Sequence, residues 1–291
     1  MTQFARSRYP FVAPGLLLVA LIYLFPLGVL FDTSLHSVQG YVSQWVGFTN
    51  FQLVLTDPTF RAAILHNLLL LVVCVPVIIV IAVFLAVFLL DEIPGSRFFR
   101  VFILVPYMFS VPVVAVVFSY FLQGSGPFNT ILRSVGLGFV AKNWLGSPHW
   151  ALVTLMGIIV WKELGFGVVL FYARLLAIPK ELFEAVTLDG AGWWQQLFHI
   201  IIPQLRGIFE FYIVTEGITM LSWVFNYVYI ISNGTGGPGT STMVTELYIY
   251  QNAFGYGSST LGIASAAATI MFFGLIGIII LGLPYLRGES Q

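Results

Sequence analysis

An all-α polytopic membrane protein with six transmembrane helices is the fold that this sequence predicts. Of its 291 residues, 59% are hydrophobic and only 8% are charged, whereas a soluble domain carries roughly 25% charged residues. The apolar residues gather into six runs, each long enough to cross a bilayer core of about 30 Å as a helix. The formal net charge is zero, so no basic field favours nucleic acid.

The first span is predicted at residues 11–31. Arg6 and Arg8 precede it, a pattern that signal peptides share with uncleaved anchors. The apolar run is longer than the h-region of a signal peptide, and no small-residue cleavage site follows it. We therefore expect this segment to remain in the chain as a membrane span.

The other spans are predicted at about 66–90, 98–122, 151–173, 205–231 and 260–284. Pro76, Pro106 and Pro112 fall inside them, which helices in lipid tolerate when neighbouring groups satisfy the freed backbone. The only cysteine, Cys74, lies in an apolar run, so an intrachain disulfide is excluded. The histidines are scattered along the sequence, and we expect no metal site.

Counting lysines and arginines predicts that both termini face the cytoplasm, because cytoplasmic loops carry an excess of these residues. The eight basic residues assigned to the inner side are Arg6, Arg8, Arg97, Arg100, Arg174, Lys180, Arg206 and Arg287. The three assigned to the outer side are Arg61, Arg133 and Lys142. The chain then divides into a cytoplasmic tail at 1–10, a six-span domain at 11–284 and a cytoplasmic tail at 285–291.

The segment 179–203 joins the fourth and fifth spans and reads PKELFEAVTLDGAGWWQQLFHIIIP. Pro179 suits the first turn of a helix, and Glu181 and Glu184 follow in its electropositive N-terminal region. We expect this helix to stop at Asp189-Gly190, because glycine tolerates the left-handed conformation that ends helices.

A second helical piece is predicted from Trp193 to about Ile201, followed by a bend at Pro203. Spacing alone leaves two interpretations of the short amphipathic helix before it. The helix either lies in the lipid interface or docks in a groove of a soluble partner.

A motif in this segment carries a resemblance to a known family. Glu184-Ala185-Val186 is followed after three residues by Gly190, and after nine more by Ile200–Pro203. This arrangement resembles the EAA loop of ABC-transporter permeases, which reads E-A-A, three residues, G, nine residues, I-x-L-P. Val186 replaces the second alanine and Ile202 replaces the leucine. The resemblance implies a coupling helix that sits on an ATP-hydrolysing subunit.

Further segments are similar to the carbohydrate-import, MalF/MalG-like branch of these permeases, so that the resemblance covers the chain from about residue 10. The segments are Gly47–Phe51, Asp57-Pro58 with Phe60, Arg100–Val114, Phe225–Tyr227, Gly236–Pro238, Ser241-Thr242 and Tyr248–Tyr250. The resemblance implies a type I importer (MetI-like) core of six spans. It also implies a second permease subunit, two ATP-binding subunits and an extracytoplasmic solute-binding protein.

The chain has no Walker A sequence, so it cannot by itself cradle ATP phosphates. We expect ATP and Mg to be bound by the partner subunits and no cofactor to be bound by this chain. The expected ATPase-coupling residues are Leu182, Phe183, Glu184, Ala185, Val186, Asp189, Gly190 and Phe198. By resemblance, Glu184 pairs with a basic residue of the ATPase; alternatively, it only stabilises the helix N-terminus.

Charged residues inside the spans are functional hypotheses, because an ionised group at the bilayer centre is costly, by roughly 2.5–3.5 kcal/mol. At 1.5 Å per residue, Lys162 and Glu216 stand about 18 and about 15 Å above the inner ends of their helices. Glu210 stands only about 6 Å above its own. We therefore expect Lys162 and Glu216 to meet near the midplane, as a static strut or as a contact for sugar hydroxyls.

The expected substrate pathway consists of Lys162, Glu216, Met220, Ser222, Trp223, Asn226 and Tyr227. Sugars need hydrogen-bonding groups beside an aromatic face, and the polar and aromatic members here recur at helical spacing. Aromatic side chains also form belts at membrane interfaces, which is the alternative interpretation of Tyr227 and Tyr229.

The sequence thus predicts a permease subunit of a binding-protein-dependent ABC importer, in a bacterial or archaeal cytoplasmic membrane. It would carry a sugar or oligosaccharide inward by alternating access. One alternative keeps this architecture and imports a glycerol phosphate or another polar solute. The other is an intramembrane enzyme that modifies glycans with Glu163 or Glu216 as a base, although no catalytic constellation is visible.

Overall fold

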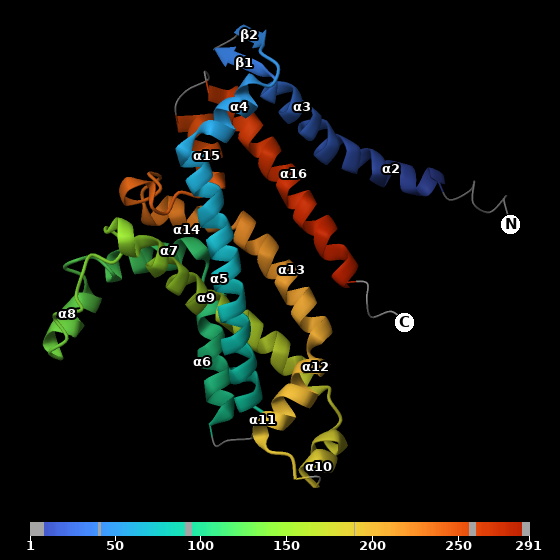
Figure 1. The fold of residues 1–291 in the computed structure, drawn as a ribbon, viewed down its shortest axis with the longest axis vertical. Coiled ribbons are helices and arrows are strands. Elements are labelled where there is room, and N and C mark those ends of the chain that lie inside the picture. The colour runs from blue at the N-terminus through green and yellow to red at the C-terminus, as the bar shows by residue number, and fades with distance from the viewer. Residues whose placement is uncertain (1–8, 40–41, 91–94, 189, 256–259, 287–291) are drawn as a thin grey trace. The chain divides into compact units, whose positions relative to one another are not determined.

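The computed structural model of the chain describes residues 9–39, 42–90, 95–188, 190–255 and 260–286, and helices dominate it (Figure 1). Most of both predicted tails lies outside the described residues, as does Asp189. Contacts divide the chain into two compact units. Unit 1 combines the chain up to Arg61 with Tyr248–Leu283, and unit 2 takes Ala62–Leu247 together with the residues after Leu283.

Unit 1 contains a helical, apolar run at Val12–Ser34 that is long enough to cross a membrane and overlaps the first span predicted at 11–31. The predicted loop that follows is more ordered than the sequence indicates, since it holds a β-hairpin, in which His36 lies opposite Trp45, and a helix. The elements are α2 (Tyr9–Val19), a π-helical turn (Ala20–Leu24), α3 (Phe25–Ser34), β1 (His36–Gln39), β2 (Val42–Trp45), α4 (Thr49–Thr56) and α16 (Leu261–Leu286).

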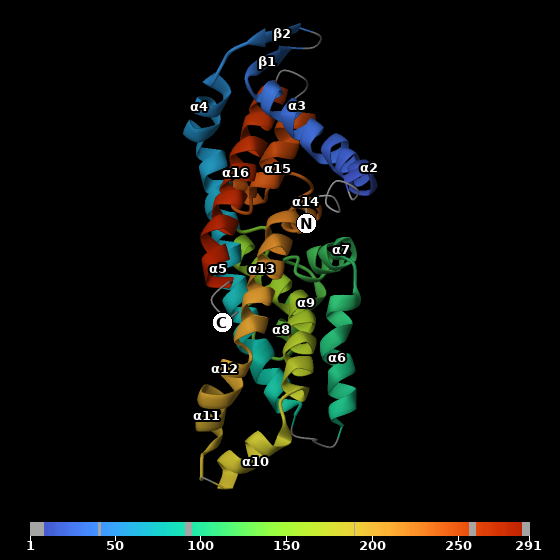
Figure 2. The ribbon, with the colours of Figure 1, turned by 90° about the vertical axis from the view of Figure 1, so that its right-hand side faces the viewer.

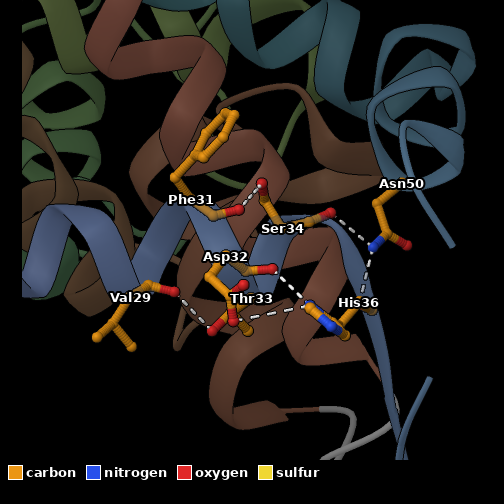
Figure 3. Close-up of polar contacts among 7 residues, drawn as sticks. All are labelled: Val29, Phe31, Asp32, Thr33, Ser34, His36 and Asn50. Atoms are coloured by element: carbon orange, nitrogen blue, oxygen red, sulfur yellow. Dashed lines mark hydrogen bonds and ion pairs between the residues drawn. The ribbon is translucent and has the colours of Figure 1, made fainter. Parts of the chain in front are cut away.

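A buried asparagine holds the end of α3 to the hairpin and α4 (Figure 3). The Asn50 amide is 5% exposed and donates to the backbone oxygens of Ser34, at 2.8 Å, and His36, at 2.9 Å. The His36 ring contacts the backbone oxygen of Asp32 at 2.7 Å. Buried donors with two partners fix local geometry, because leaving them unpaired costs about 1–3 kcal/mol.

Unit 2 contains most of α5 and the helices up to the start of α15. They are α5 (Pro58–Phe88), α6 (Ser96–Met108), α7 (Val111–Phe121), α8 (Pro127–Ser134), α9 (Pro148–Leu176), α10 (Lys180–Leu188), α11 (Trp193–Gln196), a π-helical turn (Leu197–Ile201), α12 (Ile202–Gln204), α13 (Arg206–Ser222), α14 (Val224–Ile231) and α15 (Thr245–Tyr250). Helix α6 packs against α9, and α7 packs against α14. At Gly165 of α9 a Cβ atom would lie 2.7 Å from the Ile103 carbonyl oxygen, so the close approach of α6 requires glycine.

Four helices of the described chain are long and apolar enough to cross a membrane: Val12–Ser34, Pro58–Phe88, Pro148–Leu176 and Arg206–Ile231. A bent pair adds a fifth candidate, and a shorter apolar stretch, Leu261–Gly277, lies in α16. The all-α membrane fold is confirmed, whereas the count of six spans stays a prediction.

The span predicted at 98–122 corresponds to a bent pair of helices. Its two halves, Phe98–Met108 and Val111–Phe121, are bent by 94°. Phe109 and Ser110 are extended between them. Pro106 and Pro112 flank this break and lack the N–H groups that would continue helical hydrogen bonding.

The side-chain amide of Asn67 connects helix α5 to the start of α15, because its oxygen accepts and its nitrogen donates hydrogen bonds there. Asn67 Oδ1 accepts hydrogen bonds from the Thr245 backbone, at 2.9 Å, and from its hydroxyl, at 3.1 Å. Its Nδ2 donates to both carboxylate oxygens of Glu246 at 3.2 Å. Next to it, His66 Nδ1 contacts the Met243 backbone oxygen at 2.7 Å. The loop before α15 is therefore fixed to α5 through polar groups.

Burial raises the pKa of the Glu246 carboxyl above its usual range, and hydrogen bonds from its own backbone, Asn67 and Thr245 oppose this shift in part. The native state therefore binds more protons than the unfolded state between the unfolded pKa, about 4.3, and the raised native pKa. The contribution of this group to stability is consequently lost as pH rises through that window.

We expect Glu246→Gln to raise the thermal midpoint relative to the parent as pH increases above about 5, because the amide cannot ionise in the buried site. Thermal unfolding in detergent or nanodiscs at several pH values measures this effect. Glu181→Gln, at an exposed carboxylate, is the matched control and should not change the pH profile. A Glu246→Gln profile parallel to that of the parent would contradict the assignment.

Candidate functional site

The segment between α9 and α13 folds as the sequence predicts. Helix α10 starts directly after Pro179, and the Leu182 N–H donates to the Pro179 oxygen at 3.2 Å. Gly190 has a φ of +77°, the left-handed conformation expected of a residue that follows a helix end. The Ala191 N–H then donates to the Val186 oxygen at 3.2 Å, which satisfies a carbonyl in the last turn of α10.

The second helical piece is also confirmed, over α11 and the π-helical turn Leu197–Ile201. The Gly192 N–H donates to Gln195 Oε1 at 2.8 Å, which caps the start of α11. Pro203 falls in the first turn of α12, where its missing N–H is not required. The chain thus returns from this segment into α13 as an almost continuous helical path.

Aromatic contacts attach the segment to the helices of unit 2. The Phe84 ring of α5 stacks on Trp193, with centroids 6.1 Å apart, and meets Trp194 edge-on at 6.3 Å. Phe183 of α10 lines a cavity of about 290 Å³ that also borders Leu175 of α9. Figures 1 and 2 both show α10 and α11 at the end of unit 2 where α5 and α9 finish.

Apolar side chains remain exposed on this segment. Leu182 is 39% exposed, Phe198 is 56% exposed and Leu188 is 88% exposed, while the Glu184 carboxylate is also exposed. We call Leu182, Glu184, Leu188 and Phe198 the inner-end surface. Leu188 is not among the residues expected from the sequence, although it follows Glu184 by four positions and so shares its helix face.

A second group of candidate residues is buried among the helices. Lys162 is 7% exposed and Glu163 is 4% exposed, and Lys162 Nζ lies 3.0 Å from Glu163 Oε1. Lys162 also lies over the Tyr107 ring, 4.8 Å from its centroid, and the Tyr227 hydroxyl donates to Glu163 Oε1 at 3.5 Å. We call Lys162, Glu163, Tyr227 and Glu216 the buried charge cluster; Tyr107, which is 37% exposed, borders it.

The expectation that Lys162 pairs with Glu216 is wrong. Lys162 pairs with its neighbour on α9, and no ion pair of Glu216 occurs among the residues that the structure describes. The reason is geometric, because rise per residue fixes the height of a side chain along a helix and not the face from which it projects. The charges of Glu163 and Lys162 nevertheless act on the Glu216 carboxyl.

Glu216 is 1% exposed, and its Oε1 has no hydrogen-bond partner within the described chain. The Tyr212 hydroxyl, one turn earlier on α13, is buried and similarly unpartnered in the described parts. Met220, one turn later, is 2% exposed. Three consecutive turns of α13 therefore bury one stripe of side chains that includes two polar atoms without protein partners.

The remaining residues of the expected substrate pathway differ in their exposure. Trp223, between α13 and α14, is 55% exposed, and Ser222 beside it is also exposed. Asn226 is half-buried, and Tyr227 is 2% exposed. The sequence analysis did not select Tyr107 or Tyr212, although the spacing of four residues between Tyr212 and Glu216 is a usable signal. No group of three metal-ligating side chains occurs among the described residues.

Comparison with known proteins decides the family. A family model described as "Binding-protein-dependent transport system inner membrane component" matches residues 58–285. The chain belongs to this family. It is therefore an inner-membrane component of a transport system, and in homologous systems the ATPase is a separate subunit.

Two named relatives of this permease cover most of its length. It is 30% identical over 263 residues to the lactose transport system permease protein LacF of Rhizobium radiobacter, covering 90% of this chain and 87% of the relative. It is 32% identical over 267 residues to the sulfoquinovosyl glycerol transport system permease protein SmoG of Agrobacterium fabrum, covering 90% of this chain and 84% of that protein.

A solved structure has the same fold. A bacterial ABC transporter involved in the import of the acidic polysaccharide alginate matches with a TM-score of 0.78 at 21% identity, covering 97% of this permease and 96% of that chain. The alginate transporter has also been solved with a periplasmic protein bound to an alginate pentasaccharide; it matches with a TM-score of 0.77 and 21% identity over 97% and 94% of the two chains.

Proposed function

We propose that this permease subunit carries a sugar or oligosaccharide into the cytoplasm as part of an ATP-driven, binding-protein-dependent importer. LacF and SmoG are named as permeases for lactose and sulfoquinovosyl glycerol, which are sugar-containing solutes. The observation that carries the mechanism is the inner-end surface, which exposes three apolar side chains and one carboxylate on the segment between α9 and α13. Exposed apolar residues beside a charge are typical of a surface that a partner covers.

The partner proposed for the inner-end surface is an ATP-binding subunit. Both termini would face the cytoplasm, and the segment 179–203 would face it too, where ATP is present. Two such subunits would bind ATP and Mg, a second permease would complete the pathway, and a solute-binding protein would deliver the sugar from outside. Trp193 stacks on Phe84 of α5, and Phe183 lines a cavity that Leu175 of α9 also borders, so movement of a docked subunit would be transmitted to the spans.

Within the spans, the buried charge cluster is the proposed solute contact. Polar groups without protein partners, such as Glu216 Oε1 and the Tyr212 hydroxyl, lie beside aromatic rings, which suits sugar hydroxyls and a sugar face. A phosphorylated solute fits this place less well, because Lys162 is already engaged by Glu163 and a second carboxyl lies nearby.

Site-specific cross-linking of the assembled importer tests this assignment. The only native cysteine, Cys74, is fully buried, so Leu188→Cys introduces a reactive thiol without competition from an exposed one. We expect a short thiol-directed cross-linker at 188 to reach an ATP-binding subunit, and membrane-impermeant reagents to leave it unlabelled in intact cells. Ile131→Cys, exposed on α8, is the control that should be labelled from outside. Labelling of residue 188 from outside would contradict the proposal.

A further inference from the structure

An open apolar groove of about 490 Å³ runs between α7 and α9 in unit 2. Phe118 and Leu122 form one wall, and Trp150 and Trp161 of α9 are among the residues of the other. At its floor, Gly157 has no atom within 4 Å of where a Cβ would be, so the groove is open at mid-depth. None of these residues belongs to the inner-end surface or the buried charge cluster.

The length of the groove matches one leaflet. Trp150 and Trp161 are eleven residues apart, which corresponds to about 16 Å along a helix, and half of a bilayer core is about 15 Å. Val153 beside the groove is 56% exposed, and Val117 on α7 is 55% exposed. The groove is therefore continuous with an exposed apolar surface of the kind that faces lipid.

The side-chain ammonium of Lys142 lies at one end of the groove. The Lys142 ammonium lies 3.6 Å from the centroid of the Trp150 ring and 5.0 Å from that of Trp144. Within the described chain it forms no ion pair. An ammonium on aromatic rings keeps N–H donors directed away from them, and these donors suit an anionic oxygen.

Buried hydrogen bonds fix the position of Lys142 and of the aromatic rings beneath it. Asn129 is completely buried, and its Nδ2 donates to the backbone oxygen of Lys142 at 2.7 Å and to that of Gln123 at 3.0 Å. Its Oδ1 accepts a hydrogen bond from the indole N–H of Trp144 at 2.9 Å. One amide thus fixes both the backbone that carries the cation and a ring beneath it. Thr154 of α9 adds a hydrogen bond to the Trp144 oxygen at 3.2 Å.

We propose that this groove binds an anionic glycerophospholipid, with an acyl chain lying between α7 and α9 and the phosphate at Lys142. An anionic phospholipid has a charged headgroup at one end of apolar chains that are one leaflet long, and the groove offers a cation and an apolar surface in the same order. An apolar helix of a partner protein would not provide an anionic group for this cation. Arg133, in the last turn of α8, donates through Nη2 to the Gly124 oxygen at 3.2 Å, and Asn129 Nδ2 donates to the same oxygen at 3.1 Å. The inference requires only that unit 2 spans a membrane and is independent of the transported solute.

Two substitutions separate the two parts of this site. Lys142→Gln removes the charge and keeps a polar side chain, so we expect the preference for phosphatidylglycerol over phosphatidylcholine to fall about fivefold, the equivalent of about 1 kcal/mol per basic residue. Gly157→Leu fills the open floor and should reduce retention of both lipids. Gly157→Ala, which adds only a methyl group where no atom lies within 4 Å, is the control and should retain them.

The measurement is native mass spectrometry of the complete importer released from nanodiscs that contain both lipids, combined with photo-crosslinking from a probe that replaces Val153, an exposed residue beside the groove. Cross-links to phospholipid acyl chains, with the two predicted losses, support the site. Equal retention of both lipids by the parent and Lys142→Gln would reduce the groove to an ordinary lipid-facing surface and overturn the proposal. Cross-links from 153 to the second permease subunit would also overturn it, by identifying a protein occupant.

Discussion

Glu184→Arg is expected to lower solute uptake and solute-stimulated ATP hydrolysis at least about hundredfold in the assembled importer. If Glu184 faces a basic residue of the ATP-binding subunit, the substitution places like charges in contact, which costs several kcal/mol. Glu184 is exposed on α10 and makes no ion pair within the described residues, so the permease itself should still fold.

The matched control for this experiment is Glu181→Arg. It lies one turn earlier on the same face of α10 and is also exposed, so it tests whether the effect is specific to position 184. We expect it to keep most of the transport activity. Uptake and ATP hydrolysis measured in proteoliposomes, with complex formation followed by size-exclusion chromatography, distinguish lost coupling from lost assembly. Equal effects of the two variants would show that Glu184 contributes only general charge to the helix.

Lys162→Met is expected to destabilise the permease by about 3–5 kcal/mol, because it leaves Glu163 buried and without its partner ion. The two side chains are 9% and 5% exposed, so water cannot compensate for the lost cation. The double variant Lys162→Met with Glu163→Gln should recover much of this loss, since neither side chain is then charged. Thermal unfolding in nanodiscs measures all three proteins. A single variant as stable as the parent would show that the ion pair does not support the fold.

Glu216→Gln completes this series, because it keeps the shape of the side chain and removes its charge. Normal assembly with strongly reduced uptake would identify Glu216 as a solute contact, as proposed. Loss of assembly would identify it as a strut between helices and contradict the proposed pathway. Glu210→Gln is the control on the same helix, since Glu210 is paired with Arg206 at 3.6 Å near the start of α13.

The sequence by itself determined the membrane fold, the family and the position of the segment 179–203. Hydropathy and helix caps depend on residues close together in the sequence. A membrane span, or a helix that begins after a proline and ends at a glycine, can therefore be predicted without knowing which other segments pack against it. The helix at Lys180–Leu188 and the left-handed Gly190 are results of this kind.

Only the tertiary structure decided which distant side chains meet. Lys162 selects Glu163 over Glu216, Asn67 reaches Glu246 across 179 positions, and Asn129 positions Lys142 at a groove. Such contacts depend on the rotation and crossing of helices, and these are set by packing between segments far apart in the sequence. The 94° bend at Phe109 and Ser110 also depends on tertiary packing. The prolines permit a break in the helix, but contacts with the surrounding helices set its angle.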